Sequence, residues 1–166
     1  MLKLDIDSLP EGHSHKDLRE DASELDIVID GGRLVSPVTA SLDIDRNGDE
    51  IFVAGRATVA TEMECARCLK PYAFVLGAPI QIVVMVGDVE EGAEREGLMQ
   101  VARGTGYVDL SDEVRSELLL RVPLKPLCSE DCRGLCPTCG ADLNSGKCSC
   151  GSAPGDPRWD ALKRLK

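Results

Sequence analysis

The chain has 166 residues, a formal net charge of −10, and 43% hydrophobic but only 3% aromatic residues. This length accommodates one domain or a domain with a small extra module, and so few aromatic residues require a core of Val, Leu, Ile and Ala. A run of about 20 apolar residues, which a membrane-spanning helix needs, is lacking, and the charged start MLKLDIDSLPEG has no apolar signal segment. We therefore expect a cytoplasmic protein with no membrane partner.

Charge is distributed unevenly along the chain. Residues 1–50 hold 13 acidic and 5 basic side chains, whereas residues 108–166 hold nine of each. An acidic surface repels nucleic-acid phosphates and attracts basic partners. Residues 1–24, which are polar and acidic, are expected to form a flexible N-terminal tail.

Residues 25–126 are expected to form a β-rich domain. Leu25–Ile29 is a short apolar run before an Asp-Gly-Gly turn, and alternating apolar and polar residues surround the hairpin-turn sequence Asn47-Gly48. The alternation continues through residues 59–63, and a β-branched apolar stretch covers residues 72–86. These successive strands predict an N-terminal antiparallel β-meander.

One helix is expected at about residues 111–122, after an acidic, glycine-rich loop at residues 87–106. Asp109 or Ser111 can cap this helix, and Pro123 ends it. Its apolar stripe consists of Leu110, Val114, Leu118 and Val122.

Residues 127–166 are expected to form a cysteine-rich, metal-binding tail with a short terminal helix. Asp156 and Pro157 suit the start of that helix, and Trp159 and Leu162 share its apolar face. The predicted fold class is therefore α+β, with the meander, one middle helix, a zinc-ribbon-like module and a short terminal helix.

Six of the eight cysteines lie within residues 127–151. In Cys136-Pro-Thr-Cys139-Gly, two thiolates on a tight turn can bind one ion, and Cys148-Ser-Cys150 presents two sulfurs on one side of an extended segment. Reduced thiols in the cytoplasm favour metal binding over disulfides. We therefore predict a Zn²⁺ site whose ligands are Cys136, Cys139, Cys148 and Cys150.

The other two cysteines, in Cys65-Ala-Arg-Cys68, lie between two predicted antiparallel strands, where a hairpin turn would present half of a metal site. Cys128 and Cys132 follow the predicted helix and can complete a second site with Cys65 and Cys68. Two arrangements stay open beside this one. The tail alone can bind a single ion with Cys65 and Cys68 free, or Cys132 can join the Cys136 turn in a mixed set. One or two structural zinc ions are thus expected.

Several other chemistries are less well supported by the residues. Sites of four sulfurs are closed and do not activate water, although iron fits such sites as well as zinc. A thiol oxidoreductase usually places its C-x-x-C motif at a helix N-terminus, whereas Cys65 and Cys68 have strand-like flanks. The sequence also contains no phosphate-binding loop and no plausible Ser/His/Asp set. We expect no enzymatic activity and no small-molecule substrate.

Five segments of the chain resemble one protein family. They are CARCL at 65–69, DL at 109–110, ELLLRVPLKPLCSEDCRGLCPTCGADLN at 117–144, CSC at 148–150 and DPRWDALKRL at 156–165. They resemble the bacterial YceD family, the large ribosomal RNA subunit accumulation proteins. The resemblance implies a non-enzymatic factor required for normal accumulation of large-subunit ribosomal RNA. It also implies plastid relatives and a gene that commonly neighbours one for a small basic ribosomal protein of the large subunit.

Charge and resemblance together favour a ribosome-assembly factor. We expect it to contact basic large-subunit ribosomal proteins or a pre-ribosomal particle, through acids among Asp17, Glu20, Asp21, Glu24 and Asp26. One alternative is a zinc-ribbon protein that binds ribosomal RNA directly, and the other is the thiol oxidoreductase. The basic side chains available for RNA are Lys125, Arg133, Lys147, Arg158, Lys163, Arg164 and Lys166, whereas Trp159 is expected to pack in the core.

Overall fold

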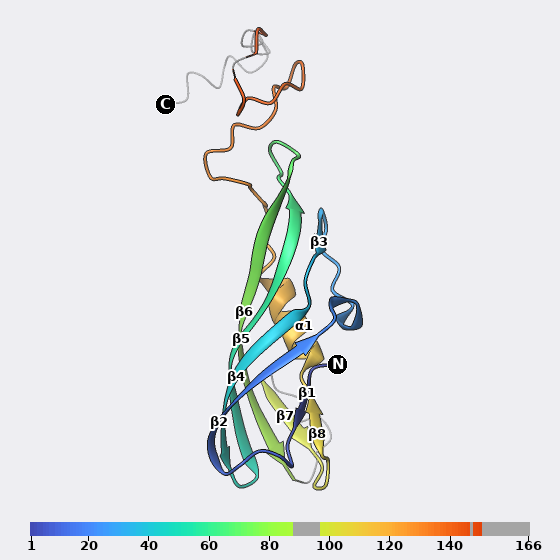
Figure 1. Ribbon diagram of the computed structural model, residues 1–166, viewed down its shortest axis with the longest axis vertical. Helices are drawn as coiled ribbons and strands as arrows, with labels where there is room; N and C mark the ends of the chain where they lie inside the picture. Colours follow the sequence, from blue (N-terminus) through green and yellow to red (C-terminus); the bar gives the residue numbers. More distant parts are fainter. Residues whose placement is uncertain (88–96, 147, 151–166) are drawn as a thin grey trace, which may run out of the picture. The chain divides into compact units, whose positions relative to one another are not determined.

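The computed structural model describes residues 1–87, 97–146 and 148–150 (Figure 1). This part of the chain contains one α-helix, α1 (Ser111–Leu120), and one 3₁₀ helix, η1 (Ala22–Leu25). The strands are β1 (Lys3–Asp5), β2 (Gly12–Glu20), β3 (Gly32–Leu34), β4 (Val38–Asn47), β5 (Glu50–Glu64), β6 (Pro71–Val86), β7 (Leu98–Val101) and β8 (Tyr107–Asp109). The fold is thus rich in sheet, as predicted. Among these residues, no helix has the length and apolar character needed to cross a membrane.

The main sheet has the strand order β2-β4-β5-β6-β7, and β3 pairs with β5 outside this path. The β2–β4 and β4–β5 pairs are antiparallel, whereas β6 and β7 are parallel, with Val83 opposite Leu98. This parallel pair departs from the predicted antiparallel meander. The sequence between β6 and β7 is close to the dozen or so residues that a parallel connection requires. Strands β1 and β8 form a separate antiparallel pair.

The hairpin between β4 and β5 forms close to the predicted place. Asn47 pairs with Glu50, so the loop residues are Gly48 and Asp49, one position later than predicted. Gly48 has a φ of 62°. A two-residue hairpin loop with glycine at its first position has the twist that suits the flanking strands.

The core lies on one face of the main sheet, where alternate residues of β4, β5 and β6 are buried. Leu42 and Ile44 are fully buried, while Asp43 and Asp45 beside them are exposed. The buried residues are almost all Leu, Ile, Val and Ala, as the composition requires. Thr61 is buried too, and its hydroxyl donates a hydrogen bond to the carbonyl of Phe74 at 2.8 Å.

The first 24 residues contain β1 and β2 instead of the flexible tail that we expected. Leu2, Leu4 and Ile6 are at most 3% exposed, and Leu4 lies opposite Val108 in the β1–β8 pair. These apolar residues alternate with polar ones, as in any strand with one buried face. The high charge of the segment concealed the pattern, because the charged side chains occupy the exposed positions.

The strand expected at Leu25–Ile29 does not form. Leu25 ends η1, and Asp26 has a φ of 46°, which interrupts an extended backbone. Leu25 and Ile29 are nevertheless buried. A short apolar run can therefore join the core without joining a strand ladder.

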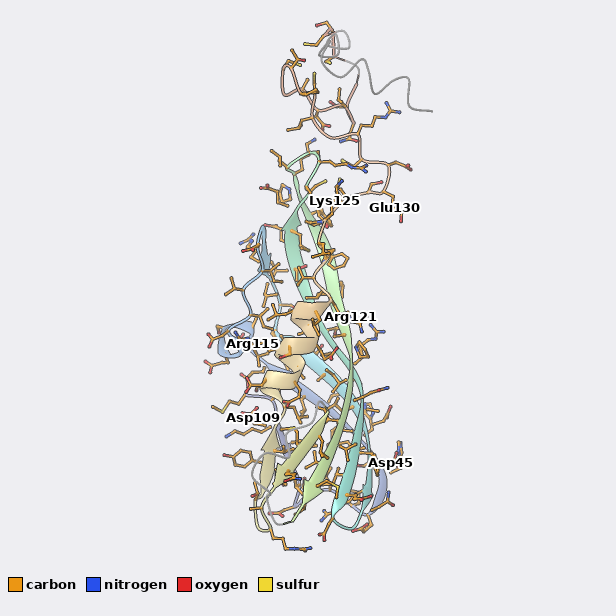
Figure 2. The ribbon with its side chains drawn as sticks, turned by 180° about the vertical axis from the view of Figure 1, so that it is seen from behind. Asp45, Asp109, Arg115, Arg121, Lys125 and Glu130 are labelled. Atoms are coloured by element: carbon orange, nitrogen blue, oxygen red, sulfur yellow. The ribbon has the colours of Figure 1, made fainter. Side chains whose placement is uncertain are left out.

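Helix α1 is two residues shorter than predicted at its C-terminal end, and neither predicted capping residue is its N-cap. Leu110 is the N-cap, while the Asp109 carboxylate accepts a hydrogen bond from the Ser111 N–H at 3.0 Å. Asp109 and Arg121 flank the helix (Figure 2). Val114 and Leu118 are buried, so the predicted apolar face is the face that packs.

The chain divides into two compact units. The first consists of Met1–Met63 and Tyr72–Leu124, and the second consists of Glu64–Pro71 and the described residues from Lys125 onward. The tip of the β5–β6 hairpin therefore belongs with the cysteine-rich region, whereas we expected it within residues 25–126. The predicted terminal helix, including Trp159, lies outside the described residues.

Candidate metal centre

The eight cysteines form two groups of four in the second unit. We call Cys65, Cys68, Cys128 and Cys132 the hairpin tetrad, and Cys136, Cys139, Cys148 and Cys150 the tail tetrad. Within each tetrad all sulfur atoms lie within 4.8 Å of one another. These are the members of the two predicted sites, and Cys132 lies with Cys65, Cys68 and Cys128, apart from the tail tetrad. Binding of an ion at either tetrad stays a prediction. Each tetrad could hold a metal ion.

Each tetrad begins with a cysteine turn of the same geometry. In the first turn the Leu69 N–H bonds to the Cys65 carbonyl at 2.9 Å, and the Cys65 N–H bonds to the Lys70 carbonyl at 3.0 Å. The second turn, which starts at Cys136, has the equivalent bonds at 2.9 and 2.8 Å. The residue after the second cysteine has a positive φ in both turns, 60° at Leu69 and 72° at Gly140. Two different sequences thus form one kind of half-site.

The remaining ligands of the hairpin tetrad are positioned by contacts with residues 66 and 67. The Ala66 N–H bonds to the Pro126 carbonyl at 2.8 Å, and the Arg67 guanidinium donates to the Cys132 carbonyl at 2.7 Å. A Cβ atom on Gly134 would lie 2.8 Å from the Arg67 carbonyl, which is too close for any other residue type. The Arg67 side chain and the bare Gly134 backbone therefore hold the chain after α1 against the hairpin tip.

The sulfur geometry of the hairpin tetrad fits a tetrahedral metal ion. Cys65 Sγ lies 3.8 Å from Cys132 Sγ, and Cys68 Sγ lies 3.7 Å from Cys128 Sγ. Zinc binds thiolates at about 2.3 Å, which places the sulfurs of a tetrahedron about 3.8 Å apart. A disulfide would need about 2.05 Å, and all eight cysteines are free. An iron ion bound by four thiolates is compatible with the same donor set.

The local electrostatics favour one thiolate in each tetrad. Hydrogen bonds from backbone N–H groups, chiefly that of Cys128, lower the pKa of Cys65 to about 6. The N–H groups of Cys139 and Thr138 likewise lower the pKa of Cys136 to about 6. By contrast, loss of water around its sulfur and hydrogen bonding to Cys132 raise the pKa of Cys128 to about 12. A bound cation would favour loss of the protons that remain.

Asn144 links the chain after the second turn to the hairpin tetrad. Its side-chain N–H donates to Cys132 Sγ at 3.4 Å, and its side-chain oxygen accepts from the Arg133 N–H at 2.8 Å. Its backbone N–H bonds to the Asp142 carboxylate, which also pairs with Lys70 Nζ at 2.6 Å. Lys70 lowers the pKa of Asp142. Groups of this kind orient the ligands of a metal site and set how firmly the site holds its ion.

Sequence reasoning missed Arg67, Lys70, Asp142 and Asn144. Asp and Asn two positions apart after a turn are typical of side chains that bond to nearby backbone, so Asp142 and Asn144 carried a usable signal. Arg67 and Lys70 carried none, since a basic residue beside a cysteine is compatible with many roles. In the described part of the second unit, Leu135 and Asp142 form a single isolated β-bridge, and the zinc-ribbon assignment stays a prediction.

The fold and these two tetrads define a sheet-rich protein with a cysteine-rich module that could hold metal ions. The sequence model of the family described as large ribosomal RNA subunit accumulation protein YceD matches residues 53–166. The chain belongs to the YceD family. No solved structure matches it.

Related proteins occur in bacteria and plants. An uncharacterized protein of Mycobacterium tuberculosis is 31% identical over 147 residues, which cover 84% of this chain and 65% of the relative. A protein of Arabidopsis thaliana named large ribosomal RNA subunit accumulation protein YCED homolog 1, chloroplastic, is 34% identical, with 79% of this chain and 49% of the relative covered. The Zea mays protein of the same name is 25% identical, with coverages of 82% and 58%. The chain thus spans about half to two thirds of the length of these relatives.

Proposed function

We propose that this chain is a non-enzymatic factor in the biogenesis of the large ribosomal subunit, and that it supports the accumulation of large-subunit ribosomal RNA. The observation that carries the proposal is the family match over residues 53–166. The names of the two plant relatives support it. The closed four-sulfur geometry of the tetrads supports a structural role for the metal, because no ligand position is left for water.

Two structural zinc ions, one in each tetrad, are part of this proposal. The two sulfur–sulfur distances of 3.8 and 3.7 Å in the hairpin tetrad match the separation of thiolates around a zinc ion and support zinc. The proposed compartment is the cytoplasm, because a reducing environment keeps eight cysteines available as ligands.

The proposed mode of action is contact with a basic ribosomal protein, and the charges of the second unit support this over direct RNA binding. Its described residues include four basic and four acidic side chains. Arg67 and Lys70 are already engaged in the contacts described above. Four thiolates around a divalent cation add a further net charge of −2 at each tetrad. Of the seven basic residues considered for RNA contact, Lys125 and Arg133 are described, and the other five lie outside the described residues.

The five acids expected to attract basic ribosomal proteins all lie in the first unit. Glu20 pairs with the N-terminal amino group of Met1, so its charge is already partly neutralised. Asp17, Asp21, Glu24 and Asp26 are exposed. Replacement of these four by Asn or Gln is expected to weaken association with ribosomal particles, because the attraction to basic proteins falls. Unchanged association would exclude this surface.

Sucrose-gradient fractionation of native lysate at low salt tests the function itself. We expect the protein to sediment with precursors of the large subunit and to be absent from mature ribosomes. In a strain without the protein, the ratio of large-subunit to small-subunit ribosomal RNA should fall. Protein that stays at the top of the gradient, together with a normal RNA ratio, would overturn the proposal. Purified protein that binds naked RNA with a steep salt dependence would favour the RNA-binding alternative.

A further inference from the structure

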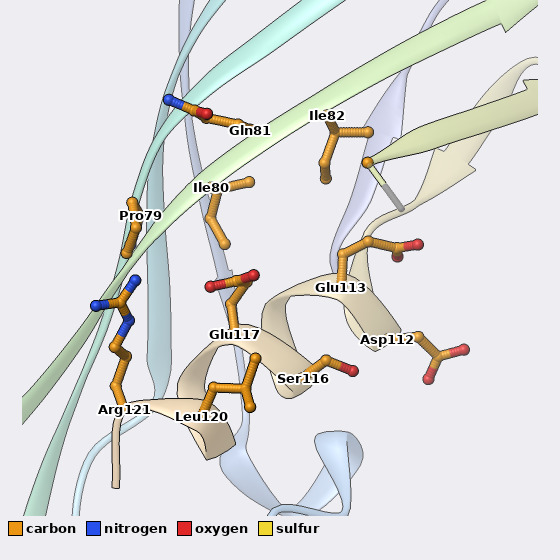
Figure 3. A pocket seen from close by; sticks show the side chains of 11 residues that line it. Pro79, Ile80, Gln81, Ile82, Asp112, Glu113, Ser116, Glu117, Leu120 and Arg121 are labelled. Atoms are coloured by element: carbon orange, nitrogen blue, oxygen red, sulfur yellow. The ribbon is translucent and has the colours of Figure 1, made fainter. Parts of the chain in front are cut away.

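A groove of about 590 Å³ lies between β6 and α1 in the first unit (Figure 3). Its strand side consists of Pro79–Ile82 together with Gly97. Its helix side includes Asp112, Glu113, Glu117, Leu120 and Arg121. No cysteine lines the groove, so it is distinct from the candidate metal centre.

The groove follows a stretch of β6 that has an open edge in the described part of the chain. On this side β7 pairs only with Val83–Val86, where the Val83 N–H bonds to the Gly97 carbonyl at 2.7 Å. Burial alternates regularly along β6 from Leu76 to Val84, so no bulge changes the orientation of its residues. Gln81, Pro79 and Gly77 therefore direct their backbone polar groups to the same side as Val83.

This edge offers more hydrogen-bond acceptors than donors. Gln81, Pro79 and Gly77 each present a carbonyl, but Pro79 has no N–H to donate. A proline within a strand is typical of an edge, and it prevents a continuous ladder with another strand. A segment bound here must therefore supply donors, many of them from its side chains.

The helix side of the groove also favours a bound segment that carries hydrogen-bond donors and positive charge. Asp112, Glu113 and Glu117 carry negative charge, and no ion pair in the described part of the chain engages them. Among the described residues, Arg121 is the single cation that lines the groove. Leu120 is 74% exposed, so an apolar side chain of a partner can pack against it. Carboxylates without an ion pair and edge carbonyls without a strand partner, both within the described residues, suit lysine and arginine side chains.

We infer that this groove binds an extended, lysine- or arginine-rich segment of a partner protein. Cationic side chains of the segment contact Glu113, Glu117 and the carbonyls at the edge of β6, and an apolar side chain packs on Leu120. RNA is disfavoured in this groove, because its phosphates would face carboxylates. The inference rests on the proposed function, in which a basic ribosomal protein of the large subunit supplies the segment.

Binding of a fluorescein-labelled peptide of alternating leucine and lysine to the full, metal-loaded chain tests this inference by fluorescence anisotropy. The variant Glu113→Gln/Glu117→Gln should bind about 5- to 10-fold more weakly, since two exposed ion pairs are lost. The control Asp30→Asn/Glu50→Gln removes the same charge at two exposed positions elsewhere on the first unit and should change affinity less than about twofold. Amide NMR shifts on adding the peptide should occur at Gln81, Gly97 and Ser116.

Equal weakening in both variants, or NMR shifts confined to other surfaces, would overturn the inference. Sucrose gradients separate this failure from a failure of the proposed function. Loss of particle association in the groove variant alone would support both proposals. Wild-type chain that never associates with particles, together with a normal ratio of large-subunit to small-subunit ribosomal RNA in a strain without the protein, would refute the proposed function. The peptide data would then decide the groove. A groove variant that keeps both its association and its peptide affinity would refute the groove alone.

Discussion

Leu69 and Gly140 occupy the same position in two equivalent cysteine turns. Each donates its N–H to the carbonyl of the first cysteine at 2.9 Å, and their φ angles are 60° and 72°. Glycine adopts this conformation without strain, whereas a left-handed conformation costs another residue about 1–2 kcal/mol. Leu69 is 56% exposed, so burial of its side chain offsets little of that strain.

The first prediction concerns these two positions. Gly140→Leu should lower the free energy of unfolding of the metal-loaded second unit by about 1–2 kcal/mol. Leu69→Gly should change it by less than about 1 kcal/mol, because relief of strain is offset by the greater freedom of glycine in the unfolded chain. Urea-induced metal release, followed with a chromophoric chelator, measures both variants. If Leu69→Gly were as damaging as Gly140→Leu, the two turns would not be equivalent.

The second prediction concerns metal content. Protein purified under reducing conditions should contain two metal ions per chain, one for each tetrad. Cys65→Ser/Cys132→Ser and Cys139→Ser/Cys150→Ser should each retain one ion, because each pair removes half of the ligands of one tetrad. Elemental analysis combined with native mass spectrometry gives both number and identity. Ser149→Ala is the control and should retain two. A wild-type chain with a single ion would contradict the two-site interpretation.

The third prediction concerns the side-chain N–H groups of Asn144, which donate to Cys132 Sγ at 3.4 Å and to the Asp142 carboxylate at 2.8 Å. Asn144→Asp keeps the oxygen that accepts from the Arg133 N–H but loses both donations and adds a negative charge beside the sulfur. Metal affinity at the hairpin tetrad should fall about 10- to 100-fold, as is usual when a group that orients a ligand is removed. Competition with a chelator of known affinity measures the change. Ser145→Ala, at the neighbouring position, should leave affinity unaltered. Equal affinities for both variants would contradict a role for Asn144.

The fourth prediction concerns pH and the exposed face of β2 and β4. His15 Nδ1 lies 2.9 Å from the Asp43 carboxylate, and this hydrogen bond raises the pKa of His15 above its usual 6.5. A raised pKa means that the pair adds stability below pH 6.5, which is lost as pH rises through the pKa of the folded state. In NMR titration, Asp43→Asn should bring the His15 pKa back towards 6.5. Asp45→Asn, next to His13, should leave it unchanged. No response to Asp43→Asn would exclude Asp43 as the cause.

The fifth prediction tests whether the N-terminal residues belong to the folded domain. Leu4 is 1% exposed, so Leu4→Ala should lower the free energy of unfolding by about 2–4 kcal/mol through loss of buried surface and the cavity left behind. Lys3→Ala, on the exposed side of β1, should change it by less than about 1 kcal/mol, because only the contact of its ammonium with the Tyr107 ring, at 4.2 Å, is lost. Urea denaturation followed by far-UV circular dichroism measures both. Equal stabilities would favour the flexible tail instead.

The tail tetrad could be predicted from the sequence because its four cysteines lie within 15 residues and their spacing is a local property. The hairpin tetrad was one of three arrangements that stayed open, because Cys65 and Cys68 lie about 60 residues before Cys128 and Cys132. The middle helix and the β4–β5 hairpin were likewise fixed by local periodicity and by a glycine in the turn. Whether the tetrads bind metal stays a prediction.

What could not be predicted depends on contacts between distant residues. Leu2 and Leu4 are buried because β1 pairs with β8, about 100 residues later. Charge alone indicated a solvated tail there. The parallel pairing of β7 and the contacts of Arg67 with the chain near Cys132 are equally non-local. In such cases the sequence around each residue is compatible with several partners, and only packing selects one.

The hairpin tetrad also constrains the order of events during synthesis of the chain. Cys65 and Cys68 leave the ribosome about 60 residues before Cys128 and Cys132, together with most of the strands of the first unit. Domains generally fold in the order in which they are made. A metal ion can be fully ligated at this tetrad only after the chain has been synthesised beyond α1. Metal loading there would thus mark a nascent chain whose sheet is already complete.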